Sequence, residues 1–172
     1  MTKQPNILMI YADQMRYDCA GFSGNPDVKT PHLDRLANEG TCFDEAFTSY
    51  PLCTPFRASL LTGKYAHKAG LYSNHFPIDT DQPSLAPILN ARGYRSGYIG
   101  KWHLGNGARY QPDRQGYDFS AVVNGPHLPG RYRVQGRPDL KPKAGQYRTD
   151  FEADLSIDFI KRSNSGGANK KP

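Results

Sequence analysis

An apolar run close to the N-terminus, Ile7 to Ala12, constrains the fold more than any other feature of the sequence. A run of this length without alternating polar residues is typical of a strand that is buried on both faces of a parallel sheet. A second strand is predicted at Tyr94–Ile99, and helix signals fill much of the chain between the two. Strands that alternate with helices predict an α/β fold, with a mostly parallel sheet flanked by helices.

The helices are predicted from capping residues and apolar spacing. Thr30-Pro31 gives a cap followed by proline at the first helical position, and Gly40 follows the last helical residue. This first helix is expected to bury Leu33, Leu36 and Ala37. Further helices are expected from Thr54-Pro55 to Gly63, at residues 84–91 and at residues 150–162. Residues 43–47 are expected to be extended, and residues 105–148 to form a loop.

The length of the chain, 172 residues, is enough for one domain with its own core but short for two. We expect residues 1–162 to be the structured part and residues 163–172, rich in Ser, Gly, Asn and Lys, to be a linker. In an α/β order, a strand should follow the helix at 150–162. We therefore expect the linker to mark a truncation point.

The net charge is +6, and much of it gathers between Arg131 and Lys143. Two interpretations remain open for this segment: a solvated loop, or a basic rim around a site for anionic substrates. Its Pro- and Gly-rich composition argues against a nucleic-acid groove. No nucleic-acid partner is therefore predicted.

The pattern of apolar residues and cysteines bears on location. No apolar stretch approaches the roughly 20 residues needed to cross a bilayer, so no membrane association is expected. The N-terminus lacks a signal-peptide pattern, which predicts a cytoplasmic protein, or a secreted or periplasmic one if a leader has been removed. The three cysteines, Cys19, Cys42 and Cys53, are an odd number, which argues against a disulfide framework.

Asp13-Gln14 is the first candidate site, because it follows the predicted first strand. Open α/β sheets bind their ligands at the carboxyl ends of strands. A carboxylate beside a carboxamide supplies hard oxygen donors, which suit Ca²⁺ or Mg²⁺. An acidic residue that only caps a loop is the alternative.

Cys53 is the second candidate, because the predicted helix begins beside it and places Arg57 one turn further along. Peptide N–H groups and the helix dipole favour an anion at this position. Cys53 is then either a nucleophile or a buried structural cysteine.

A third candidate is the pair Lys101 and His103, which point the same way on an extended chain and are able to hold an oxyanion or protonate a leaving group. Solvated side chains are the alternative for this pair.

Four stretches in this order resemble type I sulfatases, which belong to the alkaline phosphatase superfamily. Pro5–Gln14 resembles their opening strand and metal-binding turn, and Thr30–Gly40 their first helix. Cys53–Gly63 is similar to the Cys-x-Pro-x-Arg signature, and Gly93–His103 to the second signature. The resemblance implies an alkaline-phosphatase-like fold, of which residues 1–162 are the N-terminal part of the catalytic domain.

The resemblance also implies a set of roles. Cys53 is expected to be oxidised to formylglycine and to serve as the nucleophile, with Arg57 steadying that group. Lys101 and His103 are expected to contact the sulfate or its ester oxygen. Asp13 and Gln14, together with the modified Cys53, are expected to bind a divalent metal, most simply Ca²⁺, with Mg²⁺ or Mn²⁺ as alternatives. Cys19 and Cys42 match no family motif and are expected to be structural.

The implied function is hydrolysis of an anionic sulfate ester, with a formylglycine-generating enzyme as the partner that modifies Cys53. Many members have a second aspartate where this chain has Gln14. That departure leaves open a phosphonate or phosphate diester hydrolase of the same superfamily. A third alternative is a non-catalytic anion-binding protein with Cys53 unmodified. We expect the 172-residue chain by itself to be inactive.

Overall fold

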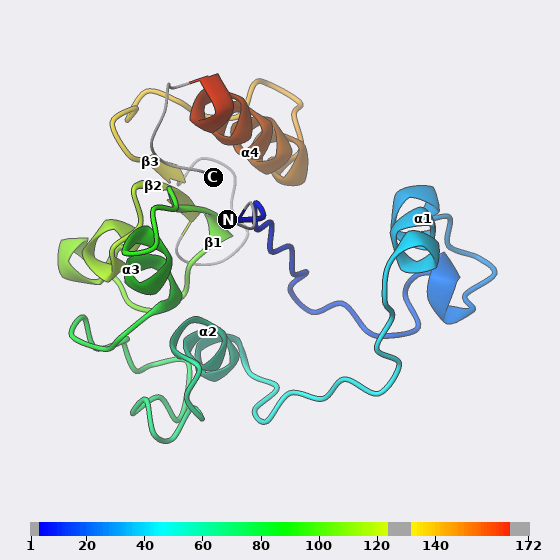
Figure 1. The fold of residues 1–172 in the computed structure, drawn as a ribbon, viewed down its shortest axis with the longest axis horizontal. Coiled ribbons are helices and arrows are strands. Elements are labelled where there is room, and N and C mark those ends of the chain that lie inside the picture. The colour runs from blue at the N-terminus through cyan, green and yellow to red at the C-terminus, as the bar shows by residue number, and fades with distance from the viewer. Residues whose placement is uncertain (1–3, 124–131, 166–172) are drawn as a thin grey trace. The chain divides into compact units, whose positions relative to one another are not determined.

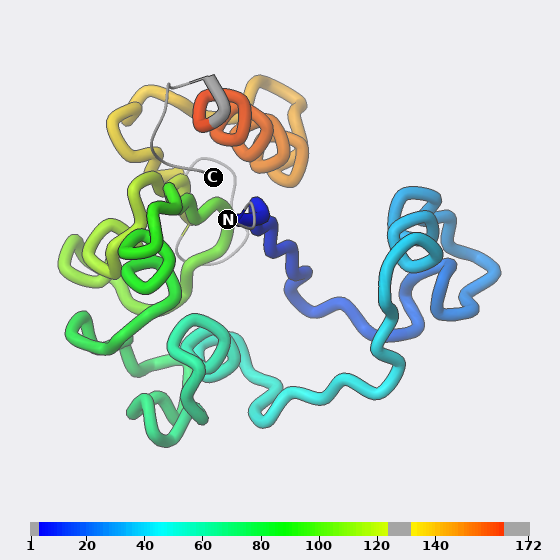
Figure 2. The backbone as a smooth tube through the Cα atoms, viewed as in Figure 1, coloured from blue at the N-terminus to red at the C-terminus, as the bar shows by residue number. Residues whose placement is uncertain are grey.

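The computed structural model describes residues 4–123 and 132–165, without the side chains of residues 164 and 165. The chain forms two compact units. Unit 1 comprises Met1–Ile7 and Ser49–Pro172, and unit 2 comprises Leu8–Thr48. The path of the backbone within each unit can be followed in Figure 2.

Unit 2 contains the 3-10 turn η1 (Gly21–Ser23) and the helix α1 (Pro31–Glu39), which has the predicted bounds. Asp34 joins the two elements, because its Oδ1 accepts hydrogen bonds from the Phe22 amide and the Thr30 hydroxyl, both at 2.8 Å. The Thr30 hydroxyl also accepts a bond from the Gly21 amide at 2.8 Å. Thr30 therefore ties η1 to the start of α1 instead of capping the helix through its own side chain.

Two predictions for the apolar residues of this region were wrong. Residues 7–12 form no strand, and Ile10 is 81% exposed. Leu33 and Leu36 of α1 are also exposed, at 41% and 65%. A strand forms only where a neighbouring strand pairs with its N–H and C=O groups, and residues 8–48 contain no strand. The expected extended segment at residues 43–47 is interrupted by a turn at Asp44 and Glu45.

Unit 1 is built on a sheet with the order β1-β2-β3 (Figure 1). Strand β1 (Gly97–Lys101) pairs in parallel with β2 (Phe119–Val123), and β2 pairs antiparallel with β3 (Tyr132–Val134). Lys101 lies opposite Val123, and Val123 lies opposite Tyr132. The carboxyl ends of β1 and β2 therefore meet the start of β3 at one edge of the sheet.

Helices cover both faces of this sheet. One core cluster joins Ala58 and Leu61 of α2 (Cys53–Thr62) and Ala86 of α3 (Leu85–Asn90) to Tyr98 of β1 and Val122 of β2. A second cluster joins Phe151 and Leu155 of α4 (Arg148–Ser165) to Ala121 of β2 and Val134 of β3. The alternating residues of β2 thus divide between the two helical layers.

The remaining elements are the 3-10 turns η2 (Ala108–Tyr110) and η3 (Pro112–Gln115). Strands β2 and β3 lie in the segment predicted to be a loop, so that prediction was wrong there. The positions of α2, α3, α4 and β1 follow the prediction to within a few residues.

The basic segment between Arg131 and Lys143 falls partly outside the described residues, as does the predicted linker at 163–172. No helix in the described ranges is long and apolar enough to cross a membrane.

Candidate active site

Cys53 is the first residue of α2 and is partly buried. The helix begins here because Leu52 is extended and Pro55 fits the first turn, where a missing N–H is tolerated. It ends at Gly63, which has the left-handed φ of 67°. Asn74 caps the first turn from a distant loop, since its Oδ1 accepts the Thr54 amide at 3.0 Å. The position predicted for Cys53, at a helix N-terminus, is confirmed.

Lys101 lies at the end of β1 and reaches this helix. Its ammonium Nζ donates to the Cys53 sulfur at 3.5 Å. In a regular strand, Lys101 would share a face with Ile99, which packs against the α4 cluster. Gly100 has a φ of 112°, a conformation open to glycine, and a side chain placed there would point toward Glu152 of α4. This change of direction turns Lys101 toward α2.

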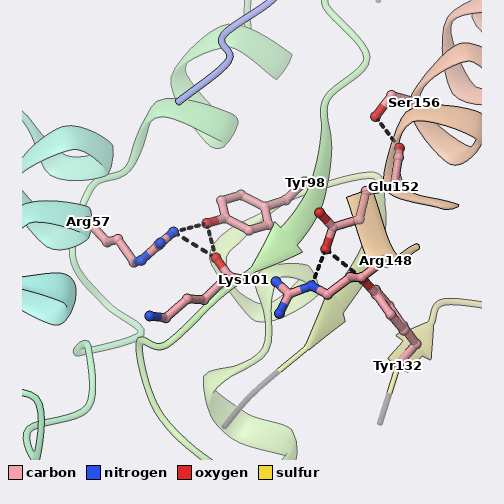
Figure 3. A network of polar contacts seen from close by, with 7 residues as sticks. All are labelled: Arg57, Tyr98, Lys101, Tyr132, Arg148, Glu152 and Ser156. Atoms are coloured by element: carbon pink, nitrogen blue, oxygen red, sulfur yellow. Dashed lines mark hydrogen bonds and ion pairs between the residues drawn. The ribbon is translucent and has the colours of Figure 1, made fainter. Parts of the chain in front are cut away.

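Arg57 of α2 holds the main chain of Lys101. Its NH1 nitrogen donates to the Lys101 carbonyl oxygen at 2.8 Å and to the Tyr98 hydroxyl at 3.3 Å. The Tyr98 hydroxyl donates to the same carbonyl at 2.7 Å (Figure 3). Arg57 is only 3% exposed. Its guanidinium therefore joins the helix that begins at Cys53 to the strand end that carries Lys101.

His103 follows β1 and is held by the same helix. The Thr54 hydroxyl donates to the His103 carbonyl oxygen at 2.6 Å. His103 has a φ of 53°, a left-handed conformation that is uncommon outside glycine and costs about 1–3 kcal/mol. The neighbouring Trp102 is fully buried, and its Nε1 donates to the Tyr110 carbonyl at 2.6 Å. Contacts on both sides thus maintain the strained turn at His103.

The structure places Cys53, Arg57, Lys101 and His103 together in unit 1. Asp13 and Gln14 lie in unit 2, in a bend where Gln14 has a φ of 58°. The metal assignment of Asp13 and Gln14 stays a prediction. Within residues 4–123 and 132–165, no three His, Cys, Asp or Glu side chains form a cluster that could hold a metal ion.

Sequence reasoning missed three residues that build the site: Thr54, Asn74 and Tyr98. Thr54 was predicted to cap the helix, but it is the second helical residue and binds His103 instead. Tyr98 was predicted only as a strand residue. Its spacing of three from Lys101 gives no signal, because the contact depends on the backbone at Gly100. Nothing in the sequence around Asn74 indicates a helix cap 20 positions earlier in the chain.

A second polar network lies at the same edge of the sheet, on the α4 side. Glu152 Oε1 accepts hydrogen bonds from the Tyr132 hydroxyl at 2.6 Å and from Arg148 Nε at 2.8 Å (Figure 3). Burial, followed by the bond to Glu152, raises the pKa of Tyr132 well above its usual range. Burial lowers the pKa of Arg148, but the bond and charge of Glu152 outweigh this effect and raise it overall. The network fixes α4 to β3.

Comparison with known proteins matches these motifs to one family. A model of the sulfatase family matches residues 5–169. The chain is 44% identical over 128 residues to an ulvan-active sulfatase of Formosa agariphila, a match that covers 72% of this chain and 25% of that protein.

Solved structures support the same relationship. The crystal structure of Ps i-CgsB in complex with k-i-k-neocarrahexaose superposes with a TM-score of 0.88 at 28% identity, covering 98% of this chain and 44% of the other. A structure of BT4656 in complex with its substrate D-glucosamine-2-N,6-O-disulfate gives a TM-score of 0.80 at 28% identity, covering 98% and 33%. The chain thus spans less than half the length of each of these proteins. The expected alkaline-phosphatase-like α/β fold is confirmed.

Proposed function

The chain belongs to the sulfatase family, and we propose that the protein hydrolyses sulfate esters with a nucleophile derived from Cys53. One observation carries the proposal: the Lys101 ammonium lies 3.5 Å from the Cys53 sulfur at the start of α2. This places a fixed positive charge beside the atom that attacks, at a helix end that favours anions. The negatively charged sulfuryl group of a sulfate ester bound there is attracted by both.

Cys53 is proposed to act after conversion to formylglycine by a formylglycine-generating enzyme. The hydrated aldehyde supplies two hydroxyls on one carbon, one to attack sulfur and one whose deprotonation later releases sulfate and restores the aldehyde. A serine or an unmodified cysteine has no second hydroxyl for this release. The net reaction consumes one water and yields an alcohol and inorganic sulfate.

Lys101 and His103 are proposed to act on the substrate itself. Lys101 offsets the negative charge that builds on the sulfuryl oxygens, because its ammonium is held beside Cys53. His103 donates a proton toward the ester oxygen as the alcohol leaves. Thr54 supports this role by fixing the His103 main chain. Arg57 contributes through the main chain of Lys101, which it binds at 2.8 Å.

Asp13 and Gln14, with the modified Cys53, are proposed to bind a divalent metal, Ca²⁺ in preference to Mg²⁺ or Mn²⁺. Their carboxylate and carboxamide oxygens are the hard donors that Ca²⁺ accepts, and this chemistry fits the ion. When bound, the metal supplies positive charge that stabilises an ionised hydroxyl at position 53. The donors present are fewer than the roughly 6–8 oxygens that Ca²⁺ takes.

The proposed substrate is a sulfate ester of a sugar. The ulvan-active relative and the structure that contains D-glucosamine-2-N,6-O-disulfate support this class. The net charge of +6 also favours an anionic substrate.

The test compares Cys53→Ala with Cys42→Ala in the full-length protein, produced together with a formylglycine-generating enzyme. We expect Cys53→Ala to abolish turnover of a chromogenic aryl sulfate, because the nucleophile is lost. Cys42→Ala, at an exposed cysteine of unit 2, should keep most of the activity. Mass spectrometry of the Cys53 peptide checks the modification. Equal loss in both variants, or faster wild-type turnover of a phosphate diester than of the sulfate, would contradict the proposal.

A further inference from the structure

We propose that Tyr98 is a positioning residue for catalysis. This inference rests on the proposed function. The Tyr98 hydroxyl fixes the main chain of Lys101 and thereby the place of the Lys101 ammonium beside Cys53. It acts through the strand end that it holds.

Three hydrogen bonds carry this inference. The Tyr98 hydroxyl donates to the Lys101 carbonyl at 2.7 Å and accepts from Arg57 NH1 at 3.3 Å. Arg57 NH1 also donates to the Lys101 carbonyl, at 2.8 Å. The three groups thus form a closed triangle between α2 and β1, as Figure 3 shows. Both the helix that begins at Cys53 and the strand that ends at Lys101 contribute to it.

The triangle exists because the backbone bends at Gly100. A tyrosine and a lysine three positions apart on a regular strand face opposite sides of the sheet. With the φ of 112° at Gly100, the Lys101 carbonyl lies within 2.7 Å of the Tyr98 hydroxyl. The pairing of β1 with β2 continues through Gly100 and Lys101, and the Tyr98 hydroxyl adds a side-chain contact to the Lys101 carbonyl at this point.

The Tyr98 ring is fixed well enough to provide that contact. Tyr98 is 7% exposed and packs edge to face against Trp102 and Tyr117, with centroid distances of 4.8 and 5.5 Å. These contacts belong to the ring and not to the hydroxyl. Removing the hydroxyl therefore leaves the core intact, together with the bond from Arg57 to Lys101. What changes is how closely the strand end is held.

The first test is Tyr98→Phe in the full-length protein, with Tyr94→Phe as the matched control. Tyr94 is also 7% exposed, and its hydroxyl also donates to a main-chain carbonyl, that of Pro5, at 2.8 Å. Both variants therefore lose one bond of the same kind. We expect Tyr98→Phe to lower kcat by about tenfold with little change in KM, because a misplaced charge costs rate and not ground-state binding. Tyr94→Phe should keep the wild-type kcat.

A double-mutant cycle separates positioning from general structure. If Tyr98 acts through Lys101, Tyr98→Phe should cost about tenfold in the wild type and nearly nothing in a Lys101→Ala background. A purely structural tyrosine would cost the same factor in both backgrounds, and that result would overturn the proposal. An unchanged kcat in Tyr98→Phe would overturn it as well.

A cross-linking experiment tests the distance between Lys101 and Cys53 without requiring catalytic activity. In full-length protein whose Cys53 remains a thiol, the shortest amine-to-thiol reagent should join Lys101 to Cys53, as the 3.5 Å distance permits. Tyr98→Phe should lose most of this product and Tyr94→Phe should keep it; equal yields in the two variants contradict the proposal. If the wild type hydrolyses no sulfate ester but Tyr98→Phe loses the cross-link, the proposed function fails and the positioning role stands.

Discussion

Arg57 brings a full positive charge into the interior of unit 1, where it is 3% exposed. Burying a guanidinium is costly unless its donors are used, and NH1 binds both the Lys101 carbonyl and the Tyr98 hydroxyl. The rigid guanidinium fork suits such a contact, which a lysine would not reproduce. The arginine of the signature therefore has a structural role in addition to any contact with the nucleophile.

The substitution Arg57→Ala is expected to reduce both rate and stability. The sequence alone predicts mainly a loss of rate, on the order of 10²–10³ for one charge-stabilising donor. The buried position adds a loss of about 2–3 kcal/mol in the free energy of unfolding, because the Lys101 carbonyl and the Tyr98 hydroxyl both lose a charged donor. Urea denaturation measures this loss.

Arg114→Ala is the matched control for that experiment. The Arg114 side chain is 68% exposed and forms a long ion pair with Asp113 at 4.0 Å. It should change stability by less than about 0.5 kcal/mol. If Arg57→Ala and Arg114→Ala unfold at the same urea concentration, the bonds of Arg57 do not contribute to folding.

The residues of the site that sequence motifs mark could be predicted, whereas a residue whose contact depends on the local backbone could not. Cys53, Lys101 and His103 were identified from motifs, and their grouping follows from a helix start and a strand end that the sequence marks clearly. Tyr98 was missed because its role depends on a single backbone angle at Gly100. Sequence patterns report side-chain type and spacing, and a bend of this kind changes which spacings meet.

Among the elements, α4 and β3 are joined by Tyr132 and Glu152 at 2.6 Å. Burial and this bond raise the pKa of Tyr132 in the folded state. Above the usual tyrosine pKa of about 10, the unfolded chain loses the proton while the folded chain keeps it. The contribution of Tyr132 to stability is therefore complete below about pH 10 and declines as the pH rises further.

Tyr132→Phe is expected to remove this pH dependence. At neutral pH the variant should be less stable than the wild type by about 1 kcal/mol, the net value of one hydrogen bond. The difference should shrink above about pH 10, because only the wild type has this proton to lose on unfolding. Denaturant unfolding at several pH values measures it, and Tyr147→Phe, at a tyrosine that is 78% exposed, is the control. A difference that widens with pH would contradict the assignment.

The helices were predictable because local signals define them: α1 and α2 end at glycines and carry prolines in the first turn. Strands β2 and β3 were not, since each has five residues or fewer and lies in a part of the sequence rich in Gly and Pro. Short strands are defined by the partners that they pair with, and their own few residues give little local signal. The apolar run at residues 7–12 shows the opposite error, a strong strand pattern without a partner among residues 8–48.

For the whole molecule, the metal site gives the clearest prediction. The 172-residue chain alone should not bind Ca²⁺ with micromolar affinity, because Asp13, Gln14 and the group at position 53 supply too few of the roughly 6–8 oxygens required. Within the described ranges no further cluster of acidic, His or Cys side chains adds to them. Isothermal titration calorimetry with Ca²⁺ tests this. Micromolar binding that Asp13→Ala abolishes would show that the chain holds a complete site.

If Cys53 is modified as proposed, the buried start of α2 sets the order in which modification and folding take place. Pro55 is fully buried and Arg57 nearly so once the helix has packed. An enzyme that recognises these side chains by contact reaches them only while the segment is still unfolded. Modification of Cys53 then competes with folding. A substitution that speeds the packing of α2 shortens the time available for the modification. A more stable variant of this chain is therefore not automatically a more active one.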